Sequence, residues 1–165
     1  MKNILQYGLT FLVVAIIALW QTGYNPFASK KEAEAVSPSV FKEMKKQTES
    51  DGKRIALVGT FSVSNSDITI KLGQPTSLMF SDENNNLIDF FKVWNGSGKN
   101  EFSLPTTFTP KDLKVYDNEG NEHSCNEKIK ISFTLKRIKE AEPEKDPNTG
   151  EYAWEWEQLR IDPLK

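Results

Sequence analysis

The residues with the widest chemical repertoire in this chain are a histidine and a cysteine two positions apart. His123 and Cys125 are the only histidine and the only cysteine of the sequence. A closed zinc site needs four such ligands, and nucleophilic catalysis needs a nucleophile, a base and an orienting partner. Because no such motif surrounds them, we interpret His123 as a polar residue beside a turn and Cys125 as an inert thiol. A single cysteine also excludes an intramolecular disulfide.

A pair of glutamates near the C-terminal end is the next candidate. Glu155 and Glu157 alternate with Trp154 and Trp156. Glycosidases use two carboxylates, so a hydrolase acting through Glu155, Glu157 or His123 is our third hypothesis. An exposed strand face produces the same alternation without any further partner. We therefore expect a non-enzymatic protein with no catalytic residue.

Two acidic runs resemble calcium loops. An EF-hand loop that began at Asp82 would need glycine at its sixth position and glutamate at its twelfth, where this chain has Leu87 and Val93. A loop that began at Asp117 would need glycine where Glu122 stands. Both runs therefore have the composition of ordinary turns. We expect no metal site and no cofactor.

The longest apolar run, Ile4–Trp20, determines the compartment of everything that follows it. Extended through Tyr24, a helix of this length approaches the roughly 30 Å of a bilayer's hydrocarbon core. Trp20 and Tyr24 suit the lipid–water interface at its end. We expect a single-pass signal-anchor over residues 1–24 that contacts the membrane through Ile4–Tyr24.

Two alternatives to the anchor remain open. A cleaved signal peptide should end in a small-x-small site, but large residues follow the run and the first such site is Ala33–Ala35. A core helix would need a larger domain to cover it. Lys2 on one side and Lys30 and Lys31 on the other leave the positive-inside bias weak. Since the run starts close to the N-terminus, we expect the inner membrane of a bacterial cell, with the C-terminal domain outside the cytoplasm.

Behind the anchor, the sequence predicts a polar tether over 25–36 and one domain over 37–165. The domain should begin with a helix, because Ser37 is a good N-cap and Pro38 suits the first helical position. Val40, Phe41 and Met44 predict its apolar stripe.

From Lys53 onward, the apolar period changes to two, which predicts strands. The expected strands are Ile55–Val63, Ile68–Leu72, Ser77–Phe80, Leu87–Trp94, Asn126–Ile138 and Tyr152–Ile161. Gly59 predicts a bulge or sharp bend in the first of them, and a change of apolar phase after Gln158 predicts a bulge in the last. Thr109–Asp112 predicts a short helical turn. The pattern indicates a mainly β domain, either a small, partly open five-stranded barrel or an antiparallel sandwich.

One resemblance refines this fold. Asp51–Phe61 (DGKRIALVGTF) resembles the first strand of OB-fold domains of the tRNA-anticodon-binding-like type, and Lys128–Ile138 with Tyr152–Ile161 resembles their closing hairpin. The chain also resembles uncharacterised membrane-anchored bacterial proteins in which a helix leads into an OB-like domain. The resemblance covers Asp51–Asp162. It departs at Ser132–Thr134, where the family's closing strand has a glycine.

The resemblance implies a ligand face with aromatic side chains. Its candidate residues are Phe90, Trp94, Tyr116, Tyr152, Trp154 and Trp156. Lys71, Lys92 and Lys114 would then contact phosphate. Alternatively, these aromatic residues fill the core and the lysines keep strand faces soluble.

The charge composition helps to choose between a protein partner and nucleic acid. The formal net charge is −2, with basic residues scattered among acidic ones, which argues against a nucleic-acid footprint. Our first hypothesis is a membrane-anchored binding or scaffold module of the bacterial envelope, whose partner is another envelope protein or a small polar ligand. The second is an anchored OB-fold nucleic-acid-binding protein that faces the cytoplasm.

Overall fold

The computed structural model of the chain describes residues 33–63, 70, 74–125, 127–140 and 144–164. The predicted anchor over 1–24 lies outside the described residues, as does the predicted strand Ile68–Leu72 apart from Ile70. In the part of the chain that the structure describes, no helix combines the length and apolar content needed to cross a membrane.

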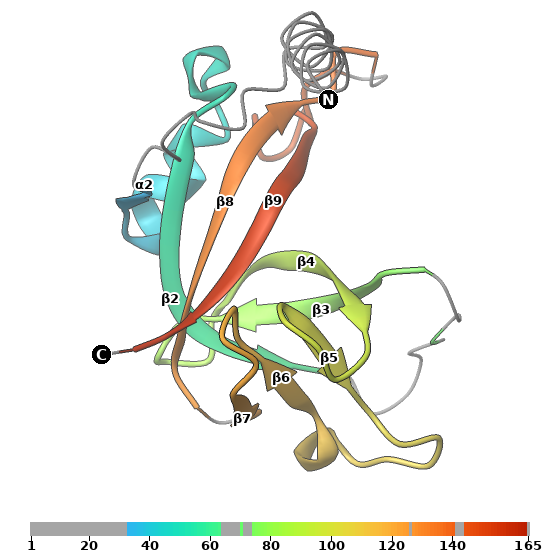
Figure 1. Cartoon of the computed structure of the whole chain (residues 1–165). Helices are drawn as coiled ribbons and strands as arrows, with labels where there is room; N and C mark the ends of the chain where they lie inside the picture. Colours follow the sequence, from blue (N-terminus) through green and yellow to red (C-terminus); the bar gives the residue numbers. More distant parts are fainter. Residues whose placement is uncertain (1–32, 64–69, 71–73, 126, 141–143, 165) are drawn as a thin grey trace, which may run out of the picture. The chain divides into compact units, whose positions relative to one another are not determined.

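The described chain is mainly β and forms one open sheet of nine strands. They are β1 (Glu34–Ala35), β2 (Arg54–Ser62), β3 (Thr76–Ser81), β4 (Leu87–Asn95), β5 (Glu101–Ser103), β6 (Lys114–Tyr116), β7 (Glu122–Ser124), β8 (Ile129–Arg137) and β9 (Trp154–Pro163). Their order is β7-β6-β5-β4-β3-β2-β8-β9, and β1 pairs with β2. Only β1–β2 and β4–β5 are parallel among these pairs. Figure 1 shows β2, β8 and β9 as long neighbouring strands, with β3 and β4 crosswise to them.

The prediction of a mainly β domain is confirmed, whereas the count of five strands is wrong. Four strands of two or three residues, β1 and β5–β7, were not expected. Such strands are too short to show an alternating pattern, and Pro105 and Pro110 interrupt the segment before β6. The sheet is also open rather than a closed barrel.

β2 is shared between two halves of the sheet. It pairs with β8 over Arg54–Gly59 and with β3 over Thr60–Ser62. Gly59 marks the changeover, where a Cβ atom would lie 2.3 Å from the carbonyl oxygen of Ser81. The predicted bend at Gly59 is therefore confirmed, because only a residue without a side chain allows β3 to approach this closely.

Aromatic rings fill the centre of the domain. Phe133 of β8 lies 5.7 Å from Phe41 and 4.9 Å from Phe91, measured between ring centroids. Phe61 and Phe80 meet at 4.9 Å in the next layer. These distances are typical of edge-to-face and tilted pairs. The fully buried large side chains are Phe41, Phe61, Phe80, Phe91, Phe102, Phe133, Ile55, Leu57, Leu78, Leu113, Ile129 and Ile131.

One helix, α2 (Pro38–Met44), covers an end of this core. The predicted N-cap is confirmed, since the Ser37 hydroxyl accepts a hydrogen bond from the backbone N–H of Val40 at 3.3 Å. Phe41 and Met44 are buried, but Val40 is 48% exposed. The predicted stripe is therefore wrong at Val40, because the domain covers only the helix face that carries Phe41 and Met44.

Lys45, at the end of α2, fastens the helix to the sheet. Its ammonium lies 2.8 Å from a carboxylate oxygen of Asp89 in β4 and 2.8 Å from one of Glu151. Burial alone would lower the pKa of Lys45, but hydrogen bonds to these two carboxylates outweigh it and raise that pKa. The Lys45 carbonyl also accepts the indole N–H of Trp154 at 2.8 Å.

Two 3₁₀ turns complete the helical content of the described residues. The first, η1, spans Thr48–Ser50 and follows α2. The second, η2, spans Pro110–Asp112, and the Asp112 carboxylate accepts the backbone N–H of Thr109 at 2.6 Å. The helical turn predicted at Thr109–Asp112 is confirmed.

β9 is fastened to the opposite half of the domain by single hydrogen bonds rather than by strand pairing. The backbone N–H of Ile161 donates to the Asn100 side-chain oxygen at 2.7 Å, and its carbonyl accepts the N–H of Asn118 at 2.7 Å. The pairing of β8 with β9 shifts register between Ser132 and Thr134, and Gln158 has a φ of 53°. The bulge predicted near Gln158 is therefore confirmed.

Candidate binding surface

The outer face of β4 presents two exposed aromatic rings. Phe91 and Val93 point inward and are fully buried, so the alternating residues Phe90, Lys92 and Trp94 point outward. Phe90 is 48% exposed and Trp94 is 52% exposed. Large aromatic side chains are usually buried in small domains. This face therefore leaves about half of two large rings in water.

Neighbouring elements hold this face in place. β3 lies alongside β4, with Met79 opposite Phe90 and Ser77 opposite Lys92. The indole N–H of Trp156 in β9 donates to the Phe90 carbonyl at 3.0 Å. At about 3.3 Å per strand residue, the two exposed rings lie roughly 13 Å apart along β4. Both rings lie on one strand, β4, which pairs with β3 and β5.

The other four candidate aromatic residues occupy partly covered positions. Trp154 and Trp156 are half-buried and pack against the core. The Tyr152 ring lies between cations, 5.5 Å from the Arg137 guanidinium and 5.0 Å from the Lys145 ammonium. Tyr116 in β6 places its hydroxyl 3.3 Å from that of Ser103. Hydrogen bonding joins Trp156 to Phe90, whereas Tyr116 and Tyr152 are engaged in contacts of their own.

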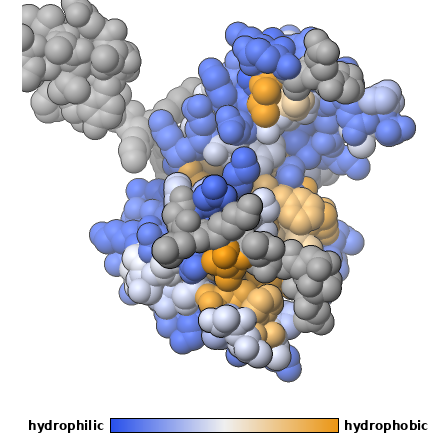
Figure 2. Space-filling view, turned by 90° about the vertical axis from the view of Figure 1, so that its right-hand side faces the viewer, coloured by the Kyte–Doolittle hydropathy of each residue, from blue (hydrophilic) through white to orange (hydrophobic). Residues whose placement is uncertain are grey.

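The candidate lysines are also separated. Lys92 is exposed between the two rings of β4, but Lys114 forms an ion pair with Glu122 at 2.8 Å. Lys71 lies outside the described residues. Figure 2 shows that hydrophobic surface gathers in the lower half of one face of the domain, whereas the upper part is largely hydrophilic. This face of the domain therefore exposes apolar area.

His123 belongs to a buried polar network in the β6–β7 hairpin. Asp117 is fully buried, and one of its oxygens accepts the backbone N–H groups of Glu119 at 2.8 Å and Asn121 at 2.9 Å. Its other oxygen accepts the Asn121 amide at 3.0 Å and lies 3.0 Å from His123 Nε2. Burial alone would raise the pKa of Asp117, but hydrogen bonds from His123 and Asn121 outweigh it and hold that pKa far below its usual range.

Within the described residues, the side-chain partners of His123 are two carboxylates. Its Nε2 faces Asp117, and its Nδ1 lies 3.4 Å from a carboxylate oxygen of Glu127. Both ring nitrogens thus face carboxylates, whereas a catalytic triad directs one nitrogen at a hydroxyl or thiol. Cys125 packs against the core. The hydrogen bonds around Asp117 join the two strands and the turn of the β6–β7 hairpin.

The remaining acidic candidates also take structural positions. Glu155 and Glu157 are exposed on β9, opposite Lys136 and Thr134 of β8. One oxygen of Asp82 accepts the backbone N–H groups of Asn84 and Asn86, each at 2.8 Å. The run from Asp82 is therefore a turn, as predicted. Within the described residues, no group of three or more His, Cys, Asp or Glu side chains is placed to hold a metal ion.

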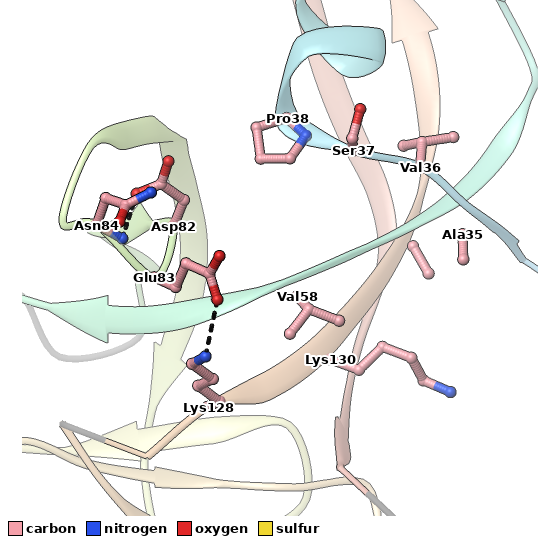
Figure 3. A pocket seen from close by; sticks show the side chains of 12 residues that line it. Ala35, Val36, Ser37, Pro38, Val58, Asp82, Glu83, Asn84, Lys128 and Lys130 are labelled. Atoms are coloured by element: carbon pink, nitrogen blue, oxygen red, sulfur yellow. Dashed lines mark hydrogen bonds and ion pairs between the residues drawn. The ribbon is translucent and has the colours of Figure 1, made fainter.

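A hollow of about 390 Å³ opens on the edge of β2. Figure 3 shows Val58 in its centre, with Val36, Ser37 and Pro38 on one side and the turn carrying Asp82 and Asn84 on another. The apolar part of its lining is formed by Ala35, Val36, Pro38, Ala56 and Val58. Sequence patterns did not indicate this hollow, because it forms where three separate segments leave a gap in the sheet.

The polar network around Asp117 was also missed, although the sequence holds a signal for it. Asp117 bonds to Asn121 four residues later, and Asp82 bonds to Asn86 at the same spacing. Aspartate side chains often bond to backbone N–H groups just ahead of them in turns. An Asp-x-x-x-Asn spacing in a polar run therefore predicts this self-contained turn.

The chain matches no family model, no curated protein and no solved structure in comparisons with known proteins.

Proposed function

We propose that this protein is a non-enzymatic, membrane-anchored binding module of the bacterial envelope, and that it contacts another envelope protein through the outer face of β4. The observation that carries the proposal is the exposure of Phe90 and Trp94 on β4, a strand that pairs with β3 and β5. Exposed aromatic rings are enriched at protein interfaces, where they supply much of the binding free energy. A partner that binds here would remove the exposed apolar area of these two rings from water.

An OB-like, partly open barrel is part of this proposal. β2 pairs with both β3 and β8, and β4 and β9 are the outer neighbours of those two strands. The hydrogen bond from Trp156 to Phe90 joins β9 to β4, and β5–β7 are an insertion between β4 and β8. In OB folds, the second and third strands carry the ligand face, and in this arrangement those strands are β3 and β4.

Membrane attachment through Ile4–Tyr24 and a β domain outside the cytoplasm complete the proposal. Its support is the length of the apolar run Ile4–Trp20, which approaches that of a spanning helix. Attachment confines the domain to the membrane surface, which favours a partner in the same membrane.

A double substitution tests the β4 surface. We expect the full chain, solubilised from its own membranes with mild detergent, to migrate on a native gel as a complex with another protein. The double substitution Phe90→Ser and Trp94→Ser should dissociate it. The matched control is Val40→Ser with Leu164→Ser, which removes similarly exposed apolar residues (48% and 45% exposed) from other elements. Loss of the complex in both double variants, or in neither, would contradict a docking role for β4.

The alternative function is nucleic-acid binding on the cytoplasmic side. Lys92 between two exposed rings favours it, because stacking rings with a nearby cation suit single strands. The formal net charge of −2 opposes it. Titration of the full chain in detergent micelles with single-stranded DNA at two salt concentrations separates the two functions. Salt-sensitive binding that Lys92→Gln weakens would favour nucleic acid over a protein partner.

A further inference from the structure

Within the described residues, one short stretch of the β2 edge has no paired strand. β1 pairs with β2 only at Ile55 and Ala56, and β3 begins to pair with β2 at Thr60. Leu57, Val58 and Gly59 lie between these two pairings on that edge. The hollow of about 390 Å³ occupies this gap.

The backbone of Val58 points into the gap. Residues of an antiparallel strand direct their N–H and C=O groups to alternate edges. Lys53 bonds to Leu135 of the β8 strand, so the odd-numbered residues of β2 face β8. Ala56 faces the other edge, where its carbonyl accepts the N–H of Val36 at 3.0 Å. Val58 has the same parity as Ala56, so its N–H and C=O also face the hollow.

The side chains around this backbone position are apolar at the centre and charged at the rim. Val58 is 44% exposed. Three rim charges already have bonded partners, because Glu83 and Lys128 form an ion pair at 3.1 Å and Asp82 is hydrogen-bonded within its own turn. Lys130, opposite Val58 on β8, has no ion pair with any described residue. Figure 3 shows Lys130 on the opposite side of Val58 from Glu83, with its ammonium directed away from Glu83. Lys130 is therefore the rim charge without a bonded side-chain partner among the described residues, and a carboxylate could pair with it.

We propose that this gap is a docking slot for a short extended peptide segment of a partner, with one residue paired to the Val58 backbone, a small apolar side chain in the hollow and a carboxylate near Lys130. Addition of a strand to an open sheet edge uses main-chain hydrogen bonds for affinity and side-chain pockets for specificity. β1 and β3 limit the open edge to one residue. A bound segment can therefore pair with β2 through only one of its residues. The slot lies apart from the outer face of β4 and does not depend on that face's function.

The experiment uses a defined probe and the full chain in detergent micelles. The probe is an acetylated and amidated pentapeptide in which valine alternates with aspartate. Its controls are the same peptide with the central valine N-methylated, which removes one backbone donor, and a peptide with lysine in place of aspartate. Two-dimensional NMR follows the amide signals of Val58, Leu57 and Gly59 and their hydrogen exchange.

We expect the aspartate peptide to shift the Val58 amide saturably and to slow its exchange. N-methylation and Lys130→Glu should each weaken binding roughly fivefold to tenfold, the effect of one lost hydrogen bond or charge pair. Phe90→Ser with Trp94→Ser should leave the peptide affinity unchanged, so failure of the slot and failure of the β4 surface are distinguishable. The peptide controls need no protein variant, so misfolding cannot imitate them. Absence of a saturable shift at Val58, or equal binding of the N-methylated peptide, would overturn the proposal.

Discussion

Gly59 shows how one residue type determines the bend of the sheet. A Cβ atom there would meet the backbone oxygen of Ser81 at 2.3 Å and the buried ring of Phe80 at 2.8 Å. Neither neighbour can move without separating β3 from β2. The sequence predicted a bend at this glycine, but the neighbours that require it come from β3 and could not be read from local sequence.

We therefore predict that Gly59→Ala lowers the free energy of unfolding by about 1–3 kcal/mol, the usual cost of overpacking. Gly96→Ala is the matched control, because the nearest atoms to its Cβ would belong to the flexible side chain of Glu101 and not to the backbone. Chemical denaturation of the full chain in detergent measures both. A cost at Gly96 equal to that at Gly59 would show that close approach of β3 is not the reason for the glycine.

The buried carboxylate of Asp117 makes the free energy of unfolding depend on pH. Its pKa is held far below the unfolded-state value of about 3.9. A group with a depressed folded-state pKa contributes stability above its unfolded pKa and loses that contribution as the pH falls toward the folded value. We predict that Asp117→Asn lowers the free energy of unfolding at pH 7 by about 2–3 kcal/mol, and that the difference from wild type shrinks between pH 5 and pH 2.

Asp82→Asn is the control for this pH profile. It alters the same Asp-x-x-x-Asn spacing in a solvent-facing turn, where the Asp82 pKa is also lowered by hydrogen bonds from Asn86. Unfolding followed by far-UV circular dichroism across pH should show a smaller loss for Asp82→Asn. An Asp117→Asn variant whose deficit stays constant with pH would contradict the role given to the buried carboxylate.

Among the elements, α2 shows which part of a pattern local sequence can predict. Ser37 and Pro38 marked the start of the helix correctly, because capping depends on neighbouring residues alone. The choice between Val40 and Phe41 as core residues depends on where the sheet lies. Phe41 packs 5.7 Å from Phe133 and 5.5 Å from Trp156, both more than 90 positions away in the chain.

We predict that Phe41→Ala lowers the free energy of unfolding by about 3–5 kcal/mol, whereas Val40→Ala changes it by less than about 0.5 kcal/mol. Thermal or denaturant unfolding of the two adjacent variants gives the comparison. A larger loss at Val40 than at Phe41 would mean that α2 packs through its other face.

The long strands could be predicted from local sequence, whereas the short strands could not. β2, β4, β8 and β9 have nine or ten residues, and the sequence predicted all four. Alternation indicated β2, β8 and β9, whereas β4 was expected from an apolar run bounded by two turns. β5, β6 and β7 have three residues each, and their pairing rests on neighbours brought together by the fold. For the candidate surface, the sequence supplied Phe90 and Trp94 among six aromatic residues. It could not separate these two from the half-buried tryptophans of β9, since both strands carry aromatic residues at alternate positions.

At the scale of the whole molecule, the proposal joins an anchor to an exported binding domain. We predict that a reporter active only outside the cytoplasm gives signal when fused after Lys165, because the positive charge of Lys2 precedes the apolar run Ile4–Trp20. A reporter active only in the cytoplasm should be silent at the same position. The reverse pair of results would place the domain in the cytoplasm and favour the nucleic-acid alternative.

The central claim is that the outer face of β4 docks a protein. Site-specific photo-cross-linking in living cells tests it most directly, with a photoreactive phenylalanine analogue in place of Trp94 and, as a control, in place of the similarly exposed Val40. We predict a discrete protein adduct from position 94 that position 40 does not give and that Phe90→Ser reduces. The same adducts from both positions, no adduct from position 94, or an adduct there that nuclease removes would contradict the claim.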